Sequence, residues 1–156
     1  MSDLRTRIKE TIESEPVVAF IKGTPAQIMC GNSERALAAL RAVGTGFTTV
    51  DVLPDPQIRQ ELSALSQWPT IPQVFVRGEL IGGADIVQER AASGQLEATL
   101  GERLGDGWRA TAGEERVAEV GPQSSAARRA AALSSSASSA RAITAGIRKK
   151  PWIWPS

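Results

Sequence analysis

The chain has 156 residues, a formal net charge of +1 at pH 7 and a single cysteine. This length suits one domain core with residues left over, and a lone cysteine argues against a disulfide-stapled secreted protein. No apolar run approaches the roughly 20 residues that a membrane helix needs. Residues 1–15 are polar and charged, with Leu4, Ile8 and Ile12 at helical spacing, so they predict an amphipathic helix and not a secretory signal. We therefore expect a soluble, cytoplasmic protein.

Apolar periodicity and turn residues predict that helices and strands alternate up to about residue 104. After the first helix, the expected elements are a buried strand over 17–21, a helix over 31–44, a strand over 47–52, a helix from 54 through 65, strands over 73–76 and 80–82 joined by a hairpin turn, and helices from 85 and from 94. The two early strands need a crossover helix between them, whereas the two late strands need only a turn. This order predicts an α/β fold with a four-stranded mixed sheet that is flanked by helices.

The composition changes near residue 104. Residues 1–104 carry a net charge of −3 and residues 105–156 a net charge of +4. The second segment contains a serine-rich run at 134–139 and few apolar anchors, so it cannot repay the entropy of folding by itself. We therefore predict one domain over 1–104 and a disordered, low-complexity basic tail over 105–156. The tail ends in cations and tryptophans, residues that can bind nucleic acid or an anionic membrane. A terminus that binds no ligand is the commoner case, so we assign no such partner.

Any sulfur chemistry of this chain depends on Cys30. A lone cysteine is often a buried, inert residue, which is the structural alternative here. However, Gly23-Thr24-Pro25 ends the first strand and a helix is predicted from Gly31, so Cys30 falls at a helix N-terminus. Unpaired N–H groups and the helix dipole favour a thiolate there, and can lower its pKa from about 8.5 to about 3.5–7.5. Ser33 stands where a dithiol motif has its second cysteine, so Cys30 must recruit an outside thiol or a metal.

Four separated segments carry a resemblance to a known family. They are Lys-Gly-Thr-Pro at 22–25, Cys-Gly-Asn-Ser at 30–33, Trp-Pro-Thr-Ile-Pro at 68–72 and Gly-Gly-Ala-Asp-Ile at 82–86. In order and spacing they resemble the monothiol glutaredoxins, whose signature is Cys-Gly-Phe-Ser after a Lys-Gly-Thr segment. The resemblance covers residues 1–104 and implies the thioredoxin fold.

The resemblance also implies a glutathione site around the cysteine. Its expected residues are Lys22 and Arg59 for the glycine carboxylate, Cys30 for the thiol, Ile71 and a cis Pro72 for the peptide backbone, and Gly83, Ala84 and Asp85 for the γ-glutamyl end. Structural alternatives exist: surface cations are common, Pro72 can simply end a strand, and Asp85 can cap a helix. Trp68 is expected to wall the site without a catalytic role.

Two activities compete for the same thiol. In the first, which the resemblance implies and which we favour, Cys30 of two chains and two glutathione thiolates bind a [2Fe–2S] cluster in a homodimer, and the protein serves iron–sulfur assembly and transfer. In the second, Cys30 takes glutathione from a mixed disulfide and a second glutathione resolves it, so the protein is a monothiol oxidoreductase. A cluster carrier is expected to have at most weak enzymatic activity. The implied partners are a BolA-type protein and apo iron–sulfur recipients.

A third possibility is a non-catalytic thioredoxin-fold adaptor, and the complete set of glutathione residues argues against it. Two positions depart from the family pattern. Asn32 replaces the usual aromatic residue of the loop, which removes apolar shielding and predicts a more labile cluster. Ala84 stands where many members have a second cysteine, so a disulfide with Cys30 is excluded.

Overall fold

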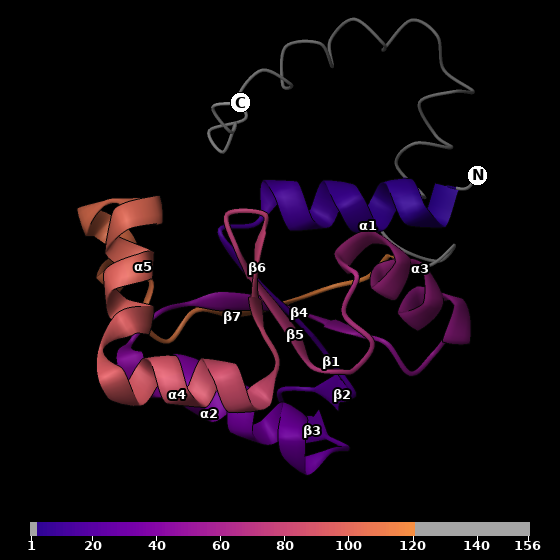
Figure 1. Ribbon diagram of the computed structural model, residues 1–156. Coiled ribbons are helices and arrows are strands. Elements are labelled where there is room, and N and C mark those ends of the chain that lie inside the picture. The colour runs from indigo at the N-terminus through magenta and orange to yellow at the C-terminus, as the bar shows by residue number, and fades with distance from the viewer. Residues whose placement is uncertain (1–2, 121–156) are drawn as a thin grey trace, which may run out of the picture.

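The computed structural model describes residues 3–120 of the chain. In chain order (Figure 1), its elements are α1 (Asp3–Ser14), β1 (Val17–Ile21), β2 (Gly23–Thr24), β3 (Gln27–Ile28), α2 (Gly31–Val43), β4 (Phe47–Asp51), α3 (Pro56–Ser66), β5 (Gln73–Val76), β6 (Glu79–Gly82), α4 (Ala84–Ser93), α5 (Gln95–Leu104), the 3₁₀-helix η1 (Asp106–Thr111) and β7 (Glu115–Ala118). Up to the end of α5 they follow the predicted order, with β2 and β3 as two additional short strands.

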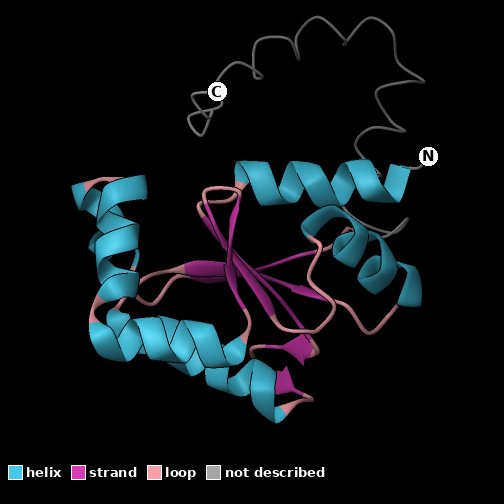
Figure 2. Ribbon diagram, in the orientation of Figure 1, coloured by secondary structure: helices cyan, strands magenta, loops and turns pink. Residues whose placement is uncertain are grey.

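A mixed sheet of five strands has the order β6-β5-β1-β4-β7. Figure 2 shows the strands in magenta at the centre of the molecule, between the helices. Strand β1 lies between β4, to which it is parallel, and β5, to which it is antiparallel. Helices cover both faces: α1 packs with α3 on one face, and α2 packs with α4 on the other. This arrangement confirms the predicted α/β architecture.

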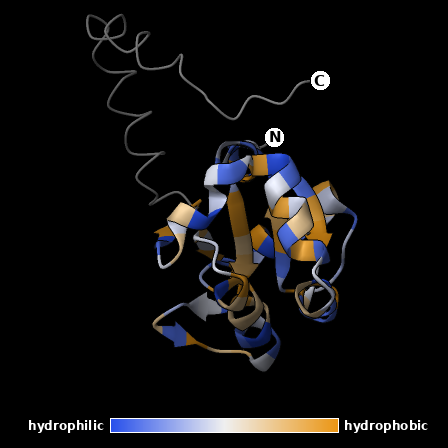
Figure 3. Cartoon of the chain, turned by 90° about the vertical axis from the view of Figure 1, so that its left-hand side faces the viewer, coloured by the Kyte–Doolittle hydropathy of each residue, from blue (hydrophilic) through white to orange (hydrophobic). Residues whose placement is uncertain are grey.

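Strand β1 divides the core in two because all five of its residues are buried. Side chains of successive strand residues point to opposite faces, so Val17, Ala19 and Ile21 join one apolar cluster with residues of α2 and α4. Val18 and Phe20 join a second cluster with residues of α1 and α3. In Figure 3 the strands at the centre are largely orange, while the surrounding helices also carry blue residues. The parallel strands β1 and β4 therefore end at the same edge of a packed core.

The sheet has five strands, and not the four predicted from the sequence, because residues after 104 add β7. Strand β7 runs parallel to β4, with Phe47 opposite Glu115. Trp108 is 6% exposed within the first cluster and Val120 is 2% exposed within the second. The folded part thus continues past residue 104, the predicted domain boundary. The rest of the predicted tail, including its tryptophan-containing end, lies outside the described residues.

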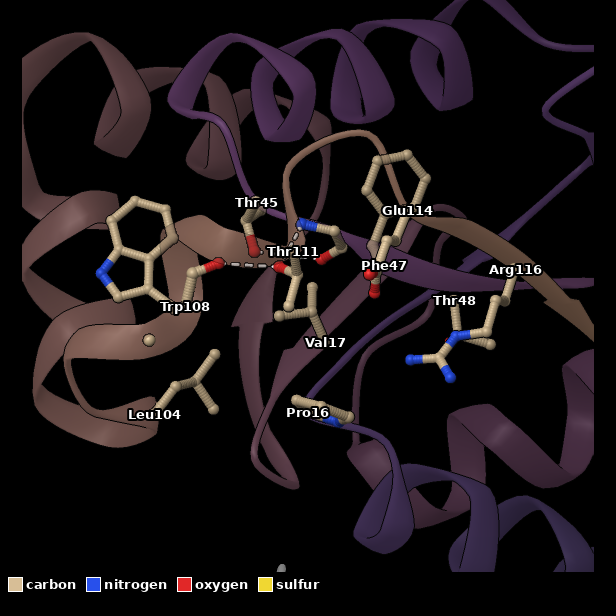
Figure 4. A pocket seen from close by; sticks show the side chains of 12 residues that line it. Pro16, Val17, Thr45, Phe47, Thr48, Leu104, Trp108, Thr111, Glu114 and Arg116 are labelled. Atoms are coloured by element: carbon tan, nitrogen blue, oxygen red, sulfur yellow. Dashed lines mark hydrogen bonds between the residues drawn. The ribbon is translucent and has the colours of Figure 1, made fainter.

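A small pocket lies where residues 104–116 meet the N-terminal ends of β1 and β4 (Figure 4). Beside it, the Thr111 hydroxyl donates to the carbonyl oxygen of Trp108 over 2.7 Å and accepts from the N–H of Gly46 over 2.8 Å. These bonds fasten η1 to the start of β4. None of the residues predicted to bind glutathione lines this pocket. Within residues 3–120, no helix is long and apolar enough to cross a membrane.

Candidate functional site

The segment between β1 and the cysteine is a small hairpin. Strand β2 pairs antiparallel with β3, and the N–H of Met29 donates to the carbonyl oxygen of Lys22 over 2.9 Å. Gly23 has a φ of +106°, and a Cβ there would lie 2.4 Å from the carbonyl oxygen of Gln27. A side chain at this position would therefore be both strained and in collision with backbone. The hairpin leads to Cys30, the residue that precedes α2.

Asp51, the last residue of β4, ties this hairpin to the sheet. Its Oδ1 accepts hydrogen bonds from the N–H of Gly23 and the N–H of Leu53, each over 2.9 Å. One carboxylate oxygen thus holds the segment after β1 and the segment after β4. Asp51 was not predicted as a site residue, because an acidic residue at the end of a strand has no distinctive sequence pattern.

Cys30 precedes α2 as its N-cap residue, with extended backbone and a partly exposed side chain. The pKa of its thiol is lowered, chiefly by the backbone N–H of Ser33. The backbone N–H of Asn32, the Ser33 hydroxyl and the charge of Lys22 also lower this pKa, whereas partial burial raises it. The arrangement favours a thiolate, as predicted for a cysteine at a helix N-terminus.

Lys22 and Arg59, which are 37 positions apart in the sequence, line one cleft of about 620 Å³. The cleft lies between the end of β1 and the helix α3. Its other lining residues are Val52, Leu53, Pro56, Gln60, Ser63 and Pro69. The hydroxyl of Ser63 is buried and has no hydrogen-bond partner among the described residues. The structure therefore brings the predicted cations Lys22 and Arg59 into one cleft. The hydroxyl of Ser63 was not predicted as part of the site, because serines on helix surfaces are common.

A second cleft, of about 260 Å³, contains the other predicted residues except Cys30, which lines neither cleft. It is lined by Asn32, Trp68, Thr70, Ile71, Pro72, Gly83, Ala84, Asp85 and Ile86. The Ile71-Pro72 peptide bond is cis. A Cβ on Gly83 would lie 3.3 Å from the carbonyl oxygen of Pro72 and 3.4 Å from Nε1 of Trp68. Glycine at this position therefore lets the start of α4 approach both walls, and Trp68 forms part of the lining as expected.

The structure corrects the capping alternative for Asp85. Gly83 is the N-cap residue of α4, with no side-chain cap, and Asp85 lies in the first turn. Its Oδ1 accepts a hydrogen bond from Nη2 of Arg35, whose Nη1 donates to Oδ1 of Asn32 and whose Nε donates to Oε1 of Gln88 over 3.1 Å. Arg35 was not predicted as a site residue, although its spacing of three residues from Asn32 on α2 indicates that the two side chains are neighbours on the helix surface.

One chain supplies few ligands to a metal centre. Within residues 3–120, no three His, Cys, Asp or Glu side chains are grouped so that they could hold a metal ion. The whole sequence contains one cysteine and no histidine. Any centre that needs several soft ligands must therefore take most of them from outside the chain.

Comparisons with known proteins give one consistent family. The family model described as Glutaredoxin matches residues 17–81. Glutaredoxin 4 of Escherichia coli K12 is 42% identical over 102 residues, which cover 65% of this chain and 89% of that protein. Glutaredoxin 4 of Buchnera aphidicola is 40% identical over 100 residues, which cover 64% of this chain and 93% of that protein. Monothiol glutaredoxin-S11 of rice is 46% identical over 99 residues, but the match spans only 20% of its length.

Solved structures agree on the fold. The reduced apo form of poplar GrxS14 matches with a TM-score of 0.58 at 35% identity, covering 64% of this chain and 91% of that one. A glutaredoxin–glutathione complex from buckwheat matches with a TM-score of 0.57 at 26% identity, covering 64% of this chain and 88% of that one. These likenesses, with the mixed sheet and its flanking helices, confirm the thioredoxin fold.

Proposed function

Because this chain belongs to the monothiol glutaredoxins, we propose that it binds glutathione beside Cys30 and carries a [2Fe–2S] cluster between two copies of itself. The observation that carries the proposal is the position of Cys30. Its partly exposed thiol has a lowered pKa and directly precedes α2, and the other predicted glutathione residues line two clefts. The site therefore offers one activated thiolate together with room for a peptide-sized ligand.

Ligand counting supports a shared cluster. A [2Fe–2S] cluster held by thiolates takes four of them, and each chain has one cysteine. Two chains supply two thiolates, so two more must come from small thiols bound at the same sites. The dimer would then receive the cluster and transfer it to a recipient protein. Apo iron–sulfur proteins and a BolA-type protein belong to the proposal as partners.

The two clefts suit the two ends of glutathione. Lys22 and Arg59 would bind its glycine carboxylate, because charge-assisted hydrogen bonds to carboxylates are strong. The backbone of Ile71 beside Pro72 would pair with the peptide, and N–H groups at the start of α4, from Gly83 onward, would bind the γ-glutamyl carboxylate. The buckwheat complex, a relative by fold, supports glutathione as the ligand.

A second candidate is favoured by the lowered pKa of Cys30, which raises the thiolate fraction at neutral pH. The Cys30 thiolate would attack the glutathione sulfur of a protein–glutathione disulfide, and the protein thiolate would leave. A second glutathione thiolate would then attack the glutathione sulfur now bonded to Cys30, releasing oxidised glutathione and restoring the thiolate. No second cysteine of the chain competes in this resolution, because the sequence has only one.

Anaerobic reconstitution of the full chain with iron, sulfide and glutathione separates the candidates. A coloured dimer with two irons per pair of chains, which reverts to a colourless monomer when glutathione is removed, is the result expected of the carrier. Cys30→Ser should abolish the colour, because a hydroxyl is a poor iron ligand. A colourless protein that still deglutathionylates a test substrate would instead support the oxidoreductase. Absence of saturable glutathione binding would leave only the adaptor.

Calorimetric titration with glutathione tests where the ligand lies. Lys22→Ala and Arg59→Ala should each weaken glutathione binding about 10- to 100-fold, since a hydrogen bond to a charged group contributes about 1.5–3 kcal/mol. Arg5→Met is the matched control, because it removes an arginine whose ion pair with Glu61 joins α1 to α3. Unchanged affinity in both cleft variants would show that the carboxylate binds elsewhere.

A further inference from the structure

Resting on the proposed glutathione site, we infer that Arg35 is a positioning residue that selects for a ligand with a free α-amino acid headgroup. Its guanidinium spans two helices. It donates to Asn32 on its own helix α2, and to Asp85 and Gln88 on α4. Asn32 and Asp85 line the second cleft, whereas Arg35 does not. Arg35 therefore acts on the cleft through the two side chains that it holds.

The contacts define what each held side chain still offers. Asn32 accepts from Arg35 with Oδ1, so the two N–H groups of its amide stay available as donors. Asp85 accepts from Arg35 with Oδ1, and no described residue donates to its Oδ2. The cleft thus presents a fixed donor and a fixed anionic acceptor on facing helices. A γ-glutamyl headgroup carries the complementary pair, a carboxylate and an ammonium group.

Asn32 and Asp85 are exposed, so the hydrogen bonds from Arg35 are what holds them in place. The Asp85 side chain is 90% exposed and that of Arg35 is 39% exposed, and Asn32 is exposed as well. An exposed side chain without a partner loses rotamer entropy when it binds a ligand. The planar guanidinium, with its fixed fork of N–H groups, orders both side chains before the ligand arrives. Removing it should therefore weaken binding at the headgroup end of the ligand and leave the opposite end unaffected.

Two ligands that differ at one end provide the test. Calorimetry on the full chain would compare glutathione with cysteinylglycine, which lacks the γ-glutamyl group, for the wild type, Arg35→Met, Asp85→Ala and the double variant. We expect Arg35→Met to weaken glutathione binding at least 5-fold, and to leave the affinity for cysteinylglycine unchanged. Arg35→Met should weaken glutathione binding less in the Asp85→Ala background than in the wild type, because Asn32 is then the only cleft side chain through which Arg35 acts. Arg35→Lys should rescue only partly, since an ammonium lacks the guanidinium fork.

Matched controls separate positioning from folding. Arg103→Met removes an arginine whose ion pair with Glu79 lies on other elements, so its glutathione affinity should match the wild type. Thermal unfolding of each variant checks that the fold is intact; the apolar side chain of methionine retains the packing of the arginine stem. Equal losses for both ligands, unchanged glutathione binding or tighter glutathione binding in Arg35→Met would overturn the inference alone. Failure of the wild type to bind glutathione would overturn the proposed function, and this inference with it.

Discussion

The backbone N–H of Lys22 donates a hydrogen bond of 3.1 Å to the hydroxyl of Ser33, whose side chain is completely buried. Lys22 directly follows β1 and Ser33 lies in the first turn of α2, so this bond fastens the start of the helix to the end of the strand. The same hydroxyl helps to lower the pKa of the Cys30 thiol. Ser33 therefore serves the site as a structural and electrostatic support in the place of a second cysteine.

Replacing Ser33 with alanine should destabilise the fold. The substitution leaves the partly buried N–H of Lys22 without its acceptor, and an unsatisfied buried donor costs about 1–3 kcal/mol. Chemical denaturation would measure the free energy of unfolding. Ser93→Ala is the control, because Ser93 is exposed and takes part in longer bonds of 3.3 and 3.4 Å. Equal stability of Ser33→Ala and the wild type would contradict the supporting role.

The reactivity of Cys30 should depend on pH in a defined direction. Because the folded state lowers the pKa of the thiol, the alkylation rate should reach half its maximum at a lower pH than that of the same thiol in the denatured chain. The matching contribution to stability is present above the pKa of the denatured chain and is lost as pH falls through the lowered pKa of the folded state. Iodoacetamide kinetics would measure the profile.

Ser33→Ala should move this alkylation profile to higher pH, since one hydrogen bond to the thiolate is lost. The midpoint should still stay below that of the denatured chain, because the backbone N–H of Ser33, the largest cause of the lowered pKa, remains. Equal midpoints for the folded wild type and the denatured chain would refute the electrostatic description of the site.

Asp51→Ala should release the hairpin that leads to the cysteine. The variant loses the acceptor for the N–H groups of Gly23 and Leu53, and a hydrogen bond to a charged group contributes about 1.5–3 kcal/mol. Amide hydrogen exchange should therefore quicken at Gly23. Asp51→Asn retains a side-chain oxygen and should show a smaller effect. Unaltered exchange at Gly23 in the alanine variant would mean that the carboxylate does not hold the hairpin.

Gly23→Ala and Gly31→Ala form a matched pair next to the site. At Gly23 the φ is +106° and a Cβ would lie 2.4 Å from a backbone oxygen, whereas a Cβ at Gly31 would meet nothing within 4 Å. We expect the first variant to be destabilised, and the second to be as stable as the wild type or slightly more so, because alanine favours the helix. Thermal unfolding checks the order, and a Gly23→Ala variant as stable as Gly31→Ala would disprove the steric requirement.

The segment after α5 should be essential to stability. A chain cut after residue 104 keeps every predicted site residue but loses β7 and the buried side chain of Trp108. In the full chain, Trp108→Ala alone should lower the free energy of unfolding by about 3–5 kcal/mol. Glu119→Ala, at an exposed position of the same segment, is the control. A cut chain that unfolds at the same denaturant concentration as the full chain would show that β7 is dispensable.

Local patterns allowed most of the fold to be predicted. The apolar run of β1 indicated a buried strand, and the spacing of apolar residues in α1 and α3 indicated helices; most of those residues are buried in the structure. Strand β7 escaped prediction because three of its four residues are exposed, so burial left no alternating pattern in the sequence. Its place is decided by a parallel ladder with β4, and by the Arg41–Glu115 pair, whose two hydrogen bonds measure 2.8 and 2.9 Å.

The amino-acid sequence is enough to identify the chemical groups of this protein: one thiol at a helix N-terminus, a proline and glycines at the expected turns, and the cations Lys22 and Arg59. Which of these groups meet depends on the tertiary structure. Lys22 and Arg59 share a cleft, Asp51 holds Gly23, and Arg35 reaches Asp85 from another helix. The physical reason is that periodicity and turn chemistry report local burial and backbone geometry, whereas contacts between distant residues depend on how the elements pack.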